Sequence, residues 1–261
     1  MASAPRLGVP APRAPPGLGV NEQVARQRRI TTALLSTLGP HGFALSGAGA
    51  LREHGILERP TEDVDLFCEQ KSDADFAAAT ARVEDALQDA RFSSERVTDV
   101  PGFLRLRVTG ADGDVVDVDL GCDYRVLAPV TLEVGPVLAL EDAVGNKVAA
   151  LFSRGEPRDF LDVDAIRRTG QFTDGQLLEL AAARDGGFTV DWFAKRLASI
   201  TRIAPERMRD RYLVDVDEFR ATQARLVAWA TTLASRPRDI HASGAASPDM
   251  QRRGPDGPQL A

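Results

Sequence analysis

Two aspartates separated by one apolar residue, Asp63 and Asp65, carry the clearest chemistry in this sequence. They lie in the segment DVDLF, whose alternation of polar and apolar residues predicts a β-strand with both carboxylates on one face. Carboxylates this close repel each other unless a divalent cation lies between them. Oxygen ligands of this kind suit Mg²⁺, which usually also binds phosphate oxygens of a substrate. The segment therefore predicts a Mg²⁺ site formed by Asp63 and Asp65.

A turn of small residues precedes this strand. The apolar segment FALS predicts a short strand, and the Gly-Ala-Gly that follows it leads into a short helix expected over 50–54. Because these residues have almost no side chain, the backbone can turn sharply and phosphates can approach amide N–H groups at the start of the helix. We therefore expect a nucleoside triphosphate to bind at Ser46, Gly47 and Ala48.

The surroundings of this first acidic pair distinguish it from similar motifs. Asp-Val-Asp occurs four times in the chain, so the motif alone is weak evidence for a metal site. The copy at 63–65 differs because the glycine turn, Arg59 and Thr61 precede it. Arg59 can counter the charge of a phosphate, and Thr61 can bind a phosphate or cap a helix. The last two copies lack this context, and we expect Asp164 to be a charge on a helix surface and Asp217 to be a helix N-cap.

A second block of charges lies on two expected helices further along the chain. Lys147 and Arg154 are seven residues apart, about two helical turns, so they can face one groove. In nucleotidyl transfer, cations opposite a metal stabilise the charge on the phosphoryl oxygens, which suits Lys147 together with Arg154 or Arg158. Asp159 or Asp162 can orient those cations or act as base toward an attacking hydroxyl. The alternative is a lattice of exposed charges on a solvated helix.

Together the two blocks resemble the AbiEii/AbiGii nucleotidyltransferase family, the toxin arm of type IV toxin–antitoxin systems, within the polymerase-β nucleotidyltransferase superfamily. In the first block, Ala-Leu-Arg and then Arg-x-Thr-Glu-Asp-x-Asp-Leu follow an apolar strand and small residues. In the second block, a helix lysine is followed by Ala-Leu, an arginine, Arg-Asp and a further aspartate. The two blocks occur in the family's order over about 43–166, which makes the match more specific than either alone. One departure is Ala48, where the superfamily usually has glycine or serine.

The resemblance also implies a third carboxylate on a neighbouring strand. The segment DVVDVDL predicts a strand over 115–120, with Asp117 and Asp119 on one face. We expect one of these two aspartates to complete the metal site. A strand with one polar face at the surface of a sheet has the same pattern, and the spacing does not choose between the two interpretations.

The family resemblance implies a fold and an activity. The fold would be α+β, with a polymerase-β-like nucleotidyltransferase core containing a small mixed sheet, followed by a helical C-terminal domain. The activity would be Mg²⁺-dependent transfer of NMP from an NTP to a tRNA 3′ end, with growth arrest as its effect. A cognate antitoxin would act without a stable complex. Two alternatives stay open from the residues: transfer to a small molecule, as in aminoglycoside-modifying enzymes, and a non-catalytic relic that binds nucleotide.

Composition sets the predicted organisation of the chain. The 261 residues and net charge of −6 fit a globular protein that does not coat nucleic acid by bulk charge. The sequence contains no apolar run long enough for a membrane span, and Cys68 and Cys122 lack the spacing of metal ligands, so we expect a cytoplasmic protein. The predicted parts are a disordered arm over 1–20, a nucleotidyltransferase core over 21–138, a helical domain completing the active-site cleft over 139–235, and a disordered tail over 236–261.

The expected elements follow from periodicity. Trp192 and Trp229 are expected in the core of the helical half. Helices are expected over 21–38, 73–90, 140–153, 157–168, 173–184, 189–199 and 217–234, and strands near 91–97, 103–108 and 115–120.

Overall fold

The computed structural model describes residues 19–59, 61–212 and 214–235. The predicted arm over 1–20 lies almost entirely outside these residues, and the predicted tail over 236–261 lies outside them entirely. The helices are α1 (Val20–Leu38), α2 (Gly47–Glu53), α3 (Asp73–Thr80), α4 (Val83–Asp89), α5 (Leu140–Ser153), α6 (Pro157–Arg168), α7 (Asp174–Ala182), α8 (Val190–Ala198), α9 (Pro205–Tyr212) and α10 (Val216–Ala234). The strands are β1 (Ala44–Leu45), β2 (Asp63–Cys68), β3 (Ser93–Val100), β4 (Phe103–Thr109), β5 (Val115–Cys122), β6 (Val130–Leu132) and β7 (Gly135–Val137).

The strands form one mixed sheet of seven strands in the order β3-β4-β5-β2-β1-β7-β6. Within it, β2 is antiparallel to β1 and parallel to β5. The register of β2 and β5 places Asp63 opposite Asp117 and Asp65 opposite Asp119. Alternate residues of the same strands, such as Val64 and Leu66 on β2, are buried in the core. The sheet therefore brings the two acidic segments side by side.

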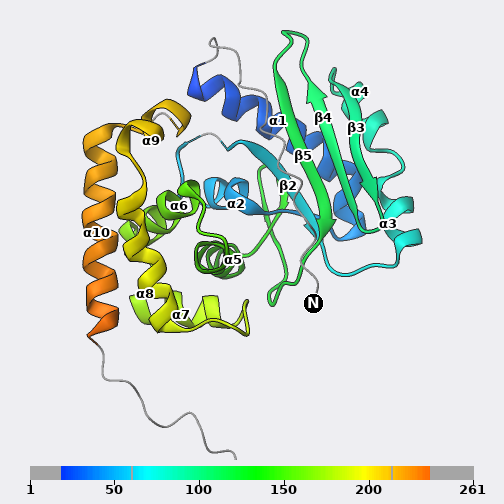
Figure 1. Cartoon of the computed structure of the whole chain (residues 1–261). Coiled ribbons are helices and arrows are strands. Elements are labelled where there is room, and N and C mark those ends of the chain that lie inside the picture. Colours follow the sequence, from blue (N-terminus) through cyan, green and yellow to red (C-terminus); the bar gives the residue numbers. More distant parts are fainter. Residues whose placement is uncertain (1–18, 60, 213, 236–261) are drawn as a thin grey trace, which may run out of the picture.

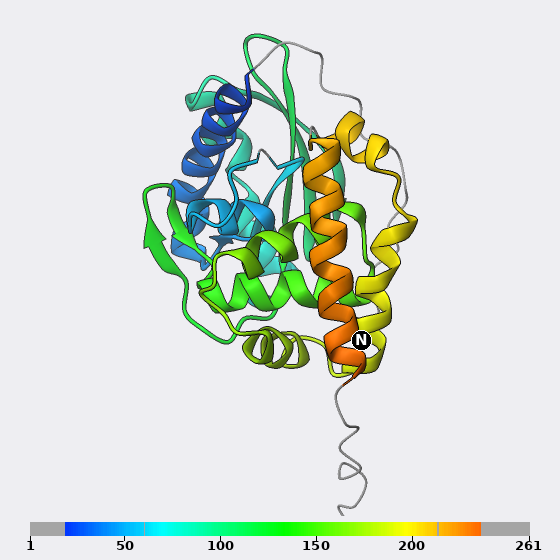
Figure 2. The ribbon, with the colours of Figure 1, turned by 90° about the vertical axis from the view of Figure 1, so that its left-hand side faces the viewer.

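One group of helices covers the sheet, and the C-terminal helices form a helical half beside it. Helices α1, α3 and α4 lie behind the sheet in the view of Figure 1, whereas α5 to α10 lie to its left. In the helical half, α10 packs alongside α8 (Figure 2). There Phe193 lies edge-on to the buried Trp229, with ring centroids 5.3 Å apart. The mixed α/β class with C-terminal helices agrees with the prediction.

The two halves share one hydrophobic core. Its buried residues include Leu51 of α2 and Val148 of α5, and α2 packs against α5.

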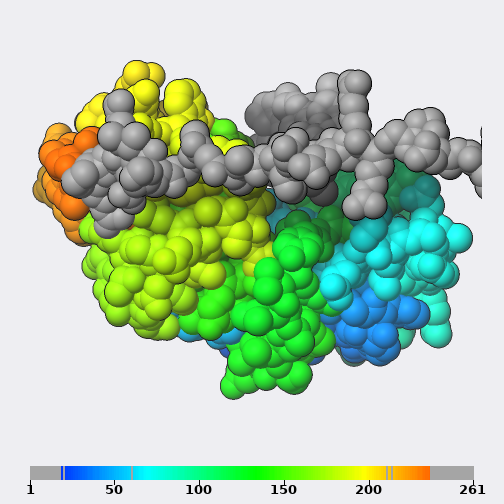
Figure 3. Space-filling view, turned by 90° about the horizontal axis from the view of Figure 1, so that it is seen from below, coloured from blue at the N-terminus to red at the C-terminus, as the bar shows by residue number. Residues whose placement is uncertain are grey.

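Seen from below, the β6–β7 hairpin (green) lies between the helical half and α1 (Figure 3). Gly135 of this hairpin approaches Leu35 of α1. None of the helices in the described part of the chain is both long and apolar enough to cross a membrane.

Several predicted boundaries are wrong for local reasons. The single helix expected over 73–90 breaks into α3 and α4, where the Thr80 hydroxyl donates back to the Phe76 carbonyl over 3.0 Å. The strand expected from residue 91 begins at Ser93, because Arg91 adopts a left-handed conformation with φ of 65°. The second helix begins at the glycine turn itself rather than after it.

The expectation that Trp192 is buried is also wrong. Its side chain points outward and the residue is 52% exposed, whereas the neighbouring Phe193 is buried.

Candidate active site

Three aspartates form an acidic cluster on the sheet. Asp63, Asp65 and Asp119 each present a carboxylate oxygen, and these oxygens lie within 4.8 Å of one another. The parallel register of β2 and β5 produces this arrangement. The fourth candidate, Asp117, lies outside the cluster, and its Oδ1 is 3.5 Å from Nε of Arg107. The structure thus brings three of the four predicted metal ligands together, with Asp119 as the third.

The acidic cluster fits a divalent cation such as Mg²⁺. All three donors are hard carboxylate oxygens, which such ions prefer. Burial raises the pKa of Asp65 to about 7, and the charges of Asp63 and Asp119 act in the same direction. A bound cation would relieve this repulsion.

The glycine turn contacts the acidic cluster directly. Gly47 adopts φ of 60°, and a Cβ added there would lie 1.9 Å from Oδ2 of Asp65. The backbone N–H of Ser46 also donates to the carbonyl of Asp65 over 2.8 Å. Glycine at position 47 therefore leaves the space that the Asp65 carboxylate occupies.

Other side chains expected to bind nucleotide face into the protein. The buried Ser46 hydroxyl donates to the Ala44 carbonyl over 3.4 Å, and Ala48 is buried. The Thr61 hydroxyl donates to the Asp63 carbonyl over 2.7 Å and lies 3.1 Å from Oε1 of Gln27. These contacts correct the expectation for Thr61: it joins the start of β2 to α1 instead of facing a phosphate.

Gln27 was not among the predicted site residues. It is fully buried, and its Nε2 donates to the Thr61 carbonyl over 2.7 Å. Its signal in the sequence is a polar residue at helical spacing from Ile30 and Leu34, on the face of α1 that the core buries.

A buried carboxylate holds two cations near the site. The Nζ of Lys147 lies 2.9 Å from Oδ2 of Asp162, and Arg59 donates to the other oxygen of this carboxylate. Burial alone would raise the pKa of Asp162, but attraction to Lys147 and Arg59 lowers it below its ordinary value. A carboxylate with a lowered pKa is a poor proton acceptor. We therefore interpret Asp162 as a group that positions Lys147 and Arg59.

Asp159 has a similar place at the α5–α6 turn. It is fully buried and accepts hydrogen bonds from Nε and Nη2 of Arg154, each over 2.8 Å. It also accepts from the backbone N–H of Glu156 over 3.1 Å, completing the capping box that begins α6. Both carboxylates that were expected as a base, Asp159 and Asp162, are held in ion pairs with cations. These contacts favour the other expected role, in which the two aspartates orient the cations.

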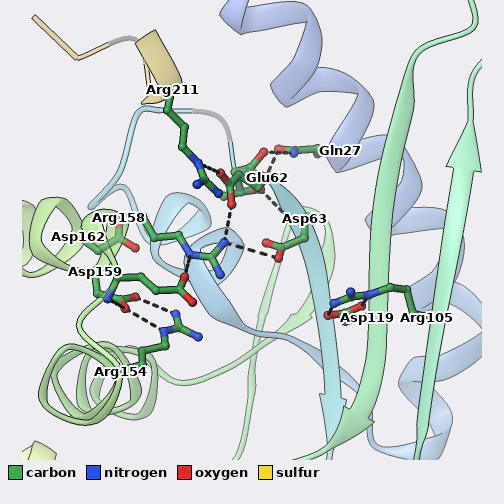
Figure 4. Close-up of polar contacts among 12 residues, drawn as sticks. Gln27, Glu62, Asp63, Arg105, Asp119, Arg154, Arg158, Asp159, Asp162 and Arg211 are labelled. Carbon is green, nitrogen blue, oxygen red and sulfur yellow. Dashed lines mark hydrogen bonds and ion pairs between the residues drawn. The ribbon is translucent and has the colours of Figure 1, made fainter. Parts of the chain in front are cut away.

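Arg158 extends from α6 toward the acidic cluster (Figure 4). Its Nη1 lies 2.9 Å from Oε2 of Glu62 and 3.7 Å from Oδ2 of Asp63. Burial lowers the pKa of Arg158, but the neighbouring Asp63 and Glu62 raise it above its ordinary value, so the guanidinium stays charged. Glu62 also lies 3.5 Å from Nε of Arg211 on α9. Neither Glu62 nor Arg211 was predicted.

On the opposite side of the acidic cluster, Arg105 of β4 holds Asp119 (Figure 4). Its Nε and Nη2 each donate to one carboxylate oxygen of Asp119 over 2.6 Å. Burial lowers the pKa of Arg105 less than the hydrogen bonds to Asp119 raise it. The cluster is therefore flanked by cations from the helical half and from the sheet.

A family model matches this chain, and several solved structures have a similar fold. A family model described as the nucleotidyl transferase AbiEii toxin of a type IV TA system matches residues 33–243. The fold is similar to JHP933 from Helicobacter pylori, with 19% identity, a TM-score of 0.51, and coverage of 82% of this chain and 93% of that chain. It is also similar to MenT4, a nucleotidyltransferase toxin from Mycobacterium tuberculosis H37Rv, with 16% identity, a TM-score of 0.50, and coverage of 82% and 86%. Among curated proteins, none matches the sequence.

Proposed function

The chain belongs to the AbiEii family of nucleotidyltransferase toxins of type IV toxin–antitoxin systems, and from this membership we propose that it transfers NMP from an NTP to the 3′ end of a tRNA in a Mg²⁺-dependent reaction. Family membership makes the chain a nucleotidyltransferase. The metal, the acceptor and the residue roles are the proposal. The acidic cluster of Asp63, Asp65 and Asp119, faced by Arg158, is the observation that carries it.

In this proposal the acidic cluster holds Mg²⁺. The three carboxylates supply hard oxygen ligands, and the space beside Gly47 allows Asp65 to reach the cluster. When bound, the ion would neutralise charge on the phosphoryl oxygens of the nucleotide.

Cations from the helical half complete the site. Arg158 lies beside Asp63, where it would bind phosphate oxygens of the nucleotide. Asp162 holds the Lys147 ammonium group in place, and Asp159 does the same for the Arg154 guanidinium. These cations would stabilise the negative charge that develops as the acceptor hydroxyl attacks the α-phosphorus and pyrophosphate leaves.

The glycine turn would receive the nucleotide. Backbone N–H groups at Gly47 and Ala48 would receive the triphosphate, because the turn lies against Asp65. A tRNA acceptor, a cytoplasmic location and an antitoxin that acts without a stable complex come from the family resemblance.

The test is a transfer assay with purified protein, Mg²⁺, each α-labelled NTP and total tRNA, resolved on a denaturing gel. Variants are Asp65→Asn, which removes a cluster carboxylate, and Asp117→Asn, which removes a carboxylate on the same face of β5 that lies outside the cluster. Label on tRNA with wild type and Asp117→Asn, but not with Asp65→Asn, supports the proposal. Absence of label on tRNA with NTP binding intact contradicts the tRNA acceptor and leaves transfer to a small molecule or a non-catalytic relic that binds nucleotide. Absence of NTP binding contradicts the proposed transfer altogether.

A further inference from the structure

Arg105 is fixed on Asp119 by more than one contact. The two residues lie directly opposite each other in the antiparallel register of β4 and β5. The Arg105 side chain is 41% exposed, whereas that of Asp119 is 11% exposed, so the guanidinium reaches inward to a nearly buried carboxylate. The guanidinium also lies 5.9 Å from the ring centroid of Phe103 on the same strand. Together with the two hydrogen bonds of 2.6 Å, these contacts hold the pair in one geometry.

This pairing makes Asp119 different from the other two carboxylates of the acidic cluster. In the described part of the chain, Asp63 has Arg158 at 3.7 Å, and neither Asp63 nor Asp65 has a bidentate arginine partner. Both oxygens of Asp119 already accept charge-assisted hydrogen bonds, so the carboxylate offers less negative charge to an incoming ion. The fixed positive charge of Arg105 also repels a divalent cation a few ångströms away.

We propose that Arg105 weakens the affinity of the acidic cluster for a divalent ion alone, so that the ion is held firmly only when the phosphates of a nucleotide add their oxygens. This inference rests on the proposed function. Mg²⁺ in such enzymes is usually bound by one or two carboxylates together with substrate phosphates. By occupying the third carboxylate, Arg105 makes ion binding depend on the nucleotide. It is a positioning residue, since it acts through Asp119.

The experiment measures Mn²⁺ binding without nucleotide, using electron paramagnetic resonance to count the free ion. Wild type is compared with Arg105→Gln and with Asp65→Asn, which lacks a cluster carboxylate. Arg107→Gln is the matched control, because Arg107 lies on the same strand, is similarly exposed at 37%, and faces Asp117 outside the cluster. We expect Arg105→Gln to bind Mn²⁺ about tenfold more tightly than wild type, since one fixed positive charge near the ion is removed. Arg107→Gln should stay within about twofold, because its charge lies farther from the ion.

A second comparison adds a non-hydrolysable NTP analogue. Phosphate oxygens then supply ligands in both proteins, so the Mn²⁺ affinities of wild type and Arg105→Gln should approach each other. Arg105→Lys keeps the charge but loses the bidentate pair, so its affinity for Mn²⁺ alone should lie between the two. If Arg105→Gln does not fold, this intermediate affinity is the result that supports the inference.

Two results overturn the inference, and they are distinguishable. If Asp65→Asn weakens Mn²⁺ binding but Arg105→Gln and Arg105→Lys bind as wild type does or more weakly, the role of Arg105 is wrong and the metal site stands. If wild type and Asp65→Asn bind Mn²⁺ equally, the acidic cluster is not the ion site, and both this inference and the metal assignment fail.

Discussion

Replacing Asp162 with asparagine removes the negative charge that lies between Lys147 and Arg59 and keeps the shape of the side chain. Removing one partner of a buried ion pair typically costs 3–5 kcal/mol, because the other charge stays buried without compensation. Asp162 is fully buried and the Lys147 side chain is 9% exposed, but that of Arg59 is 19% exposed and can regain some hydration. We therefore expect a loss of about 3 kcal/mol in the free energy of unfolding, near the lower end of that range.

Urea unfolding followed by circular dichroism at pH 7.5 measures this loss. For a domain of this size, about 3 kcal/mol corresponds to a decrease in melting temperature of roughly 6–12 °C. Asp217→Asn is the control, because Asp217 pairs with Arg220 on the surface and is 86% exposed. Surface pairs contribute about 0–1 kcal/mol, so this control should melt close to wild type.

The loss should also depend on pH. Attraction to Lys147 and Arg59 lowers the pKa of Asp162 below its ordinary value, so its stabilisation is present above that ordinary value and is lost as pH falls through the lowered one. The difference between wild type and Asp162→Asn should therefore be constant from pH 5 to 8 and shrink in stronger acid. A variant within about 1 kcal/mol of wild type at pH 7.5 would refute the reasoning, because it would mean that the two cations do not depend on this carboxylate.

Three further outcomes are expected. Gly47→Ala should abolish Mn²⁺ binding and nucleotide transfer, because its Cβ would displace the Asp65 carboxylate; unchanged Mn²⁺ binding would contradict this. In the absence of metal, Asp65→Asn should have a higher melting temperature than wild type at pH 8, and the difference should be smaller at pH 5. Burial favours the neutral Asp65 carboxyl group, so its stabilisation is complete below its ordinary pKa of 3.8 and is lost as pH rises through its folded-state pKa of about 7. The gain in the free energy of unfolding at pH 8 is at most about 4 kcal/mol, and calorimetry that finds no gain would exclude a charge penalty at Asp65. Burial raises the pKa of Cys68 to about 12, so a disulfide reagent at pH 8 should label the partly exposed Cys122 alone; two adducts by mass spectrometry would be inconsistent with this.

Alternation in the sequence predicted which residues share a face, but not how neighbouring strands align. Asp117 and Asp119 belong to the same face of one strand, so the pattern could not choose between them. The choice depends on the register of β5 with β2, which sets Asp119 against Asp65 and Asp117 against Asp63. Register comes from contacts between distant segments, and no local pattern contains it.

The helix charges show the same limit. Asp164 was expected on a helix surface, but it is buried and accepts hydrogen bonds from Arg225 and Thr222 of α10. Helix α6 packs against both α5 and α10, so it buries carboxylates on two sides. The spacing of apolar residues in a sequence predicts only one buried side of a helix. The N-cap of α10 is Asp215 rather than the expected Asp217. The Asp215 side chain accepts hydrogen bonds from the backbone N–H groups of residues 217 and 218.

Short polar elements were missed for a different reason. Helix α9 contains mostly charged residues, and its fully buried Met208 gives no apolar repeat to detect. The short strands β6 and β7 are likewise too brief for alternation to be recognised. Arg211 and its contact with Glu62 therefore had no sequence signal.

The distance along the chain between the charges of the site has a consequence for synthesis. Asp63 and Asp65 are made early, Asp119 follows later, and the buried partner of Arg59 is Asp162, which lies 103 residues after it. At about 5–20 residues per second, a ribosome needs roughly 5–20 s to add that many residues. A translation product that stops within this interval lacks Asp162, the buried carboxylate that holds Arg59. For a member of a toxin family, an incomplete chain therefore carries parts of the site but not the site itself.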